Sequence, residues 1–183
     1  MSEEMFVRQC APTLAGVKTG NLFSCPYSSR EDIIEEVRKL NRILVPKGLR
    51  LLPLRYSEKR VLLYLYRPAE LWRDLTESKA AQILADAGYP CKDCDNCVVM
   101  LIRRLRGYED FPHEIGLFLG YPPEDVKGFI DNKAANFKYS GLWKVYGDEK
   151  RAKALFEKFK KCTDIYCRLW RDGASLDTLT VAA

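Results

Sequence analysis

The chain has 183 residues, of which 47% are hydrophobic and 30% charged, and its net charge is +5. This length and composition are typical of one ordinary globular domain, and the mild positive charge does not by itself indicate a nucleic-acid partner. No apolar run approaches the roughly 20 residues of a membrane-spanning helix, and the N-terminus lacks a signal-peptide pattern, so we expect a cytoplasmic protein with no membrane partner.

The first part of the chain predicts a helix, a short strand and a second helix. Pro12 suits the first turn of a helix, which would place Cys10 just before the helix start. Residues 22–25 form an apolar run typical of a strand. Ser28 or Ser29 is expected to cap a second helix that ends before Pro46, because its apolar residues recur at helical spacing.

The clearest sheet signal lies in residues 49–67. Two apolar runs, 49–56 and 61–67, flank a short polar segment, which is the pattern of a β-hairpin. Pro53 cannot donate a ladder hydrogen bond, so its strand should be an edge strand or carry a bulge. We expect one face of this hairpin to pack on the helix over residues 29–44.

The second half of the chain is mostly helical by pattern. Pro68 begins a helical region, Thr76 or Ser78 caps the next helix, and a further helix covers residues 98–105. A strand is predicted over 141–147, and Asp148 caps a long helix that ends near Arg171. The order of elements predicts a single α+β domain over residues 1–183. We expect a small antiparallel sheet of three to five strands, packed with helices, and a long C-terminal helix.

The stretch from residue 111 to 129 contains the only histidine, His113, with Glu114 beside it. An apolar segment ends at a Tyr121-Pro122 turn, and a second short helix follows. Two short helices at this spacing are compatible with a helix-turn-helix. Acidic residues occupy the first turn of the second helix, where they would repel DNA phosphates, so this pattern argues against a nucleic-acid partner.

Several motifs resemble a domain-of-unknown-function family found mainly in anaerobic bacteria. They lie at residues 10–16, 111–116, 119–126, 143–146 and 179–181. The resemblance covers nearly the whole chain and implies a single cytoplasmic domain, but it implies no activity. Its shared motifs point to a set of positions as candidate catalytic or binding residues: Cys10, Lys18, His113, Glu114, Tyr121, Trp143 and Lys144.

Cys91, Cys94 and Cys97 have the spacing Cys-x-x-Cys-x-x-Cys, outside the motifs of the resemblance. Thiolates at this spacing can converge on zinc or an iron–sulfur cluster. The fourth ligand of a bacterial ferredoxin would fall on Leu101, so a cluster would need a ligand from elsewhere. Three reduced surface cysteines are the alternative. The metal hypothesis predicts a metal- or redox-linked protein.

Cys10 and His113 support a second hypothesis, a cysteine-dependent hydrolase or transferase. A cysteine at a helix start followed much later by a histidine is the order found in papain-like enzymes, with Glu114 or Asn136 to orient the imidazole. A non-catalytic interaction module is the third hypothesis. Basic residues along the helix over 148–171 could meet an acidic protein partner, or they could form a solvated face.

Overall fold

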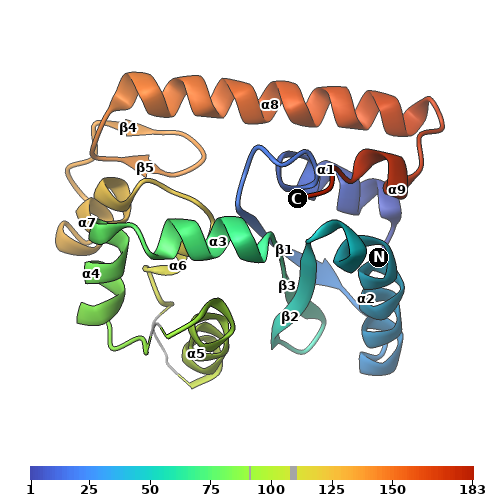
Figure 1. Ribbon diagram of the computed structural model, residues 1–183, viewed down its shortest axis with the longest axis horizontal. Helices are drawn as coiled ribbons and strands as arrows, with labels where there is room; N and C mark the ends of the chain where they lie inside the picture. Colours follow the sequence, from blue (N-terminus) through green and yellow to red (C-terminus); the bar gives the residue numbers. More distant parts are fainter. Residues whose placement is uncertain (91, 108–110) are drawn as a thin grey trace. The chain divides into compact units, whose positions relative to one another are not determined.

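The computed structural model describes residues 1–90, 92–107 and 111–183. These residues form two compact units, the first made of 1–69 with 159–183 and the second of 70–158. Across the described residues there are helices, a three-stranded antiparallel sheet and a separate two-stranded one (Figure 1), which confirms the α+β class. The prediction of one domain stays a prediction, and each unit is described by itself below.

The sheet of the first unit confirms the predicted hairpin. Strands β2 (Arg50–Tyr56) and β3 (Arg60–Tyr66) pair antiparallel, and β1 (Gly20–Pro26) pairs with the other side of β3. The resulting order is β1-β3-β2. The register of the β2–β3 pair shifts between Pro53 and Arg55. Pro53 therefore lies on an edge strand and beside a bulge, as its missing N–H requires.

Helix α2 (Arg30–Leu44) covers the sheet with the apolar face predicted from its sequence. Ser29 caps it by accepting a hydrogen bond from the Asp32 amide at 3.1 Å. The buried residues of α2 join the hydrophobic core with side chains from α1 and from all three strands. They are Ile33, Val37, Leu40 and Leu44. A short 3₁₀ turn, η1 (Val45–Lys47), then leads into β2.

Helix α1 (Glu3–Leu14) begins well before the predicted position. Ser2 caps it, and Glu3 and Glu4 occupy the first turn, where acidic groups suit the helix dipole. Pro12 lies inside the last turns of the helix rather than at its start. Cys10 is therefore a buried residue of the helix interior, and the prediction that it stands just before a helix start is wrong.

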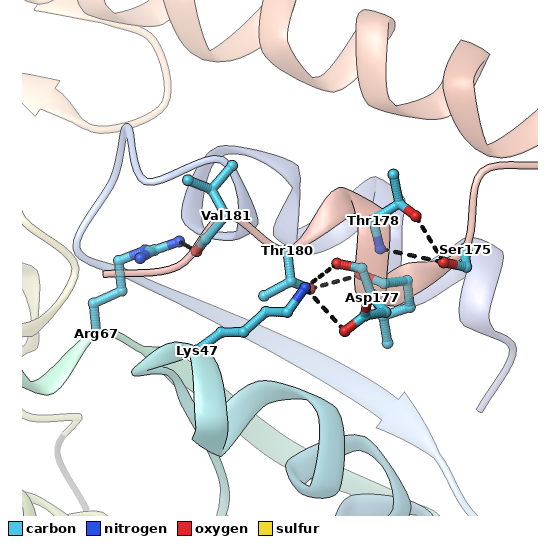
Figure 2. A network of polar contacts seen from close by, with 8 residues as sticks. Lys47, Arg67, Ser175, Asp177, Thr178, Thr180 and Val181 are labelled. Atoms are coloured by element: carbon cyan, nitrogen blue, oxygen red, sulfur yellow. Dashed lines mark hydrogen bonds and ion pairs between the residues drawn. The ribbon is translucent and has the colours of Figure 1, made fainter.

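The C-terminal segment is fixed to the first unit by two basic side chains (Figure 2). The buried Arg67 guanidinium donates to the carbonyl oxygens of Thr13, Leu14 and Val181 at 2.7–2.9 Å. The Lys47 ammonium contacts the Asp177 carboxylate at 2.9 Å. The segment consists of helix α9 (Leu176–Leu179) and the residues after it, and it follows the long helix α8 (Glu149–Arg171).

In the described residues, the second unit consists mainly of short helices and one small strand pair. Its elements are α3 (Pro68–Leu75, which starts at the unit boundary), α4 (Ser78–Asp86), α5 (Cys94–Gly107), α6 (Ile115–Phe118), α7 (Pro123–Asp131), β4 (Tyr139–Ser140) and β5 (Lys144–Val145), followed by the start of α8. None of the helices in the described ranges is long and apolar enough to cross a membrane.

The strand predicted over residues 141–147 is much shorter in the structure, where β5 covers only Lys144–Val145. A physical reason lies in Asp125, whose carboxylate accepts the amide N–H groups of Tyr146 and Gly147. These donors are therefore engaged by a side chain instead of a neighbouring strand. The long helix predicted after Asp148 is present as α8, and Asp148 caps it.

Candidate functional site

A pocket of about 360 Å³ in the second unit contains four of the residues that the sequence motifs indicate. His113, Tyr121, Trp143 and Lys144 all line it. The rest of the wall comes from α6, α7, the β4–β5 hairpin and one residue before α6. These residues are Phe111, Ile115, Gly116, Asp125, Val126, Phe129, Ser140, Gly141 and Leu142.

Asp125 holds the hairpin against helix α7. One carboxylate oxygen accepts the Trp143 indole N–H at 2.7 Å, and the other accepts the amides of Tyr146 and Gly147 at 2.8 and 2.7 Å. Asp125 is only 3% exposed, and it lies in the first turn of α7, where the helix dipole also favours its charge. Asp125 therefore fixes the position of Trp143 in the pocket wall.

Aromatic rings form much of the pocket wall. Tyr121 stacks on Trp143 with ring centroids 4.4 Å apart, and His113 meets Phe129 edge to face at 4.9 Å. Gly116 allows α6 to approach α7, because a Cβ at this position would lie 2.8 Å from Val126 and 3.1 Å from Tyr121. The wall is thus largely aromatic and apolar, which favours contact with an aromatic group.

Lys144 brings a positive charge to this apolar wall. Its ammonium donates to the Ala134 carbonyl at 2.7 Å and lies 4.7 Å above the Phe137 ring and 5.9 Å above the Phe129 ring. The loop that it contacts is unusual, because Lys133, Ala134 and Asn136 all have positive φ angles. Such conformations are costly for residues other than glycine and persist where surrounding contacts hold them.

The Glu114 carboxylate, which the sequence suggests as a group that orients His113, belongs to a buried network. This carboxylate accepts from the Arg104 guanidinium at 2.6 Å and from the Tyr89 hydroxyl at 3.0 Å. Burial, followed by the nearby Glu114 charge, raises the pKa of the Tyr89 hydroxyl. Arg104 also donates to the Ala87 carbonyl, so Glu114 takes part in a network that ties α4, α5 and the start of α6 together.

Cys10 and Lys18 lie together in the first unit. The Lys18 ammonium donates to Asn21 at 3.2 Å and lies 5.8 Å above the Phe159 ring. Burial raises the pKa of the fully buried Cys10 thiol, and burial lowers the pKa of Lys18 to about 8. Both shifts favour the neutral thiol and amine. Because Cys10 and His113 belong to different units, their catalytic pairing stays a prediction.

We expect the Cys10 thiol to react slowly with thiol reagents, because a buried neutral thiol is a poor nucleophile. Iodoacetamide labelling of the folded protein, followed by peptide mass spectrometry, should modify the half-buried Cys167 well before Cys10. Both cysteines should react at similar rates in denaturant. Labelling of Cys10 as fast as Cys167 in the folded protein would instead support the hydrolase hypothesis.

The three-cysteine metal hypothesis involves Cys91, which lies outside the described residues. Cys94 is half-buried and Cys97 fully buried, both on α5, whose first turn is capped by the Asp93 carboxylate. Among described residues, no group of three or more His, Cys, Asp and Glu is placed to hold a metal ion. Zinc or iron–sulfur binding stays a prediction, which metal analysis of anaerobically purified protein would decide.

Asp125 and Phe129 also line the site, although the sequence indicates neither as a site residue. An acidic residue in the first turn of a helix, such as Asp125, is common because the helix dipole favours it there, so its position alone does not indicate a site. The roles of Asp125 and Phe129 depend on contacts with the hairpin, which is distant in the chain. Asp125 and Tyr146, for example, are 21 residues apart. No local pattern signals such a contact.

Comparison with known proteins finds one family. The model of the family described as "Protein of unknown function (DUF3793)" matches residues 6–180, which is nearly the whole chain. No curated protein and no solved structure matches.

Proposed function

We propose that this chain, which belongs to the DUF3793 family, is a ligand-binding protein whose second unit binds a small, flat, largely apolar molecule. The observation that carries the proposal is the pocket lined by His113, Tyr121, Phe129, Trp143 and Lys144. Apolar walls with a few convergent polar groups are the usual composition of a small-molecule site.

The size of the pocket supports this function. Its volume of about 360 Å³ lies at the lower end of the range for small-molecule sites, which runs from roughly 300 to 1,000 Å³. A two-ring molecule is therefore a suitable ligand. Two exposed apolar side chains, Phe111 and Leu142, also line the pocket and would lose contact with water when a ligand binds.

The contacts of the polar groups favour binding over catalysis. Asp125 and Glu114 both accept hydrogen bonds from partners that build the unit. Within the part of the chain that the structure describes, no hydrogen bond joins the Ser140 hydroxyl to His113, although both line the pocket. Such a bond is the usual sign of an activated nucleophile. The metal and hydrolase hypotheses stay as separate predictions, with the tests given above.

A variant that fills the pocket tests this proposal. Replacing Ser140 with tryptophan adds a large ring at an exposed position of the pocket wall, so it should block the site while preserving the fold. Saturation-transfer NMR with 1-naphthamide and 1-naphthoate should detect binding to the wild type and a loss of at least about tenfold in affinity in the variant.

Lys150→Trp is the matched control, because it adds the same ring at an exposed position of α8 that does not line the pocket. This control should bind both probes as the wild type does. Equal binding by the Ser140 and Lys150 variants, or no binding of either probe to the wild type, would contradict the proposed function.

A further inference from the structure

We propose that the ligand of this pocket is an aromatic carboxylate and that the Lys144 ammonium recognises its negative charge. This inference rests on the proposed function and adds the chemical class of the ligand. The inference follows from three properties of the pocket. They are the contacts of Lys144, the hydrogen bonds that Asp125 accepts, and the aromatic rings beside them.

The contacts of Lys144 leave its charge without an anionic partner among the described residues. Lys144 is half-buried, and its ammonium has three N–H donors, one of which the Ala134 carbonyl accepts. The remaining contacts are with the faces of Phe129 and Phe137. A ligand carboxylate would supply a charge-assisted hydrogen bond, which is stronger than a neutral one.

Asp125 is the carboxylate that lines the same pocket, and its charge must be weighed against an anionic ligand. Three N–H donors, from Trp143, Tyr146 and Gly147, already surround its two oxygens. Donors placed in this way partly offset the negative charge. In the described structure, the Lys144 ammonium contacts the Ala134 carbonyl and the rings of Phe129 and Phe137, so its charge can still be met by a ligand anion.

A single charge suits a carboxylate better than a phosphate. In the described part of the pocket wall, Lys144 is the one lysine or arginine. Phosphate recognition usually combines several cationic or backbone N–H donors. The ring surfaces of Tyr121, Trp143 and Phe129 favour an aromatic body next to the charged group.

The test uses three probes with the same ring system and different charge: 1-naphthoate, 1-naphthamide and 1-naphthylmethylammonium. Isothermal titration of the full chain should show that the carboxylate binds at least about tenfold more tightly than the amide, and that the ammonium binds most weakly. Lys144→Met should remove the preference for the carboxylate over the amide, so that the two probes bind with affinities within about twofold of each other.

Lys150→Met is the matched control, because it removes the same charge from an exposed position in the same unit outside the pocket. It should keep the full preference. Three results would overturn this inference and leave the proposed function intact. They are equal affinity for the carboxylate and the amide in the wild type, a preference for the ammonium probe, and a preference for the carboxylate that survives in Lys144→Met. Failure of all three probes to bind would overturn both.

Discussion

Replacing Asp125 with alanine is expected to lower the free energy of unfolding by about 4 kcal/mol, because three hydrogen bonds to a charged group are lost together. The donors are the Trp143 indole and the amides of Tyr146 and Gly147, and the site of the lost carboxylate is 3% exposed. Denaturant unfolding followed by tryptophan fluorescence measures this change.

Asp125→Asn is the matched comparison, because the amide keeps one acceptor oxygen and nearly the same volume. It should lose roughly half as much stability as the alanine variant, since it can still accept from part of the donor set. A loss below about 0.5 kcal/mol for Asp125→Ala would show that the three bonds do not hold the hairpin.

Replacing Arg67 with methionine is the second change with a large expected effect, a loss of about 3 kcal/mol of unfolding free energy. The guanidinium is 2% exposed and donates to three backbone carbonyls, those of Thr13, Leu14 and Val181. Methionine keeps the apolar stem but removes all of these charge-assisted hydrogen bonds, and the Thr13 and Leu14 carbonyls then keep only their backbone donors, the amides of Gly16 and Val181. Hydrogen exchange at the Val181 amide, which donates to the Leu14 carbonyl, should also become faster.

Lys47→Met is the control for this prediction. Lys47 holds the same C-terminal segment through Asp177, but the Asp177 side chain is 68% exposed, so the ion pair should contribute less than about 1 kcal/mol. Similar losses of stability in both variants, or an unchanged exchange rate at Val181 in Arg67→Met, would contradict the role assigned to Arg67.

The sequence predicts the parts of this fold that depend on neighbouring residues. The hairpin over 49–67 follows from two apolar runs on either side of a polar segment, and the edge position of Pro53 follows from the missing N–H of proline. The Ser29 cap follows from local backbone chemistry. Pro12 misled the prediction of the first helix, because the cap at Ser2 starts α1 earlier and the helix accommodates proline in its interior.

The site could be predicted only in part. The motifs indicate His113, Tyr121, Trp143 and Lys144, and these four residues line one pocket. Glu114 belongs to the same motif as His113, yet its carboxylate contacts Arg104 and Tyr89. Motifs identify residues but not the direction of their side chains, which depends on long-range packing.

The central claim is that the second unit binds a ligand in this pocket. Chemical-shift mapping tests this claim most directly. Titration of ¹⁵N-labelled protein with 1-naphthoate and 1-naphthamide should shift the Trp143 indole N–H and the amides of Gly116 and Gly141, all of which line the pocket. With each probe that binds, these signals should move together and saturate at one dissociation constant. Saturable shifts confined to residues 1–69 and 159–183, or no saturable shift with either probe, would contradict the claim.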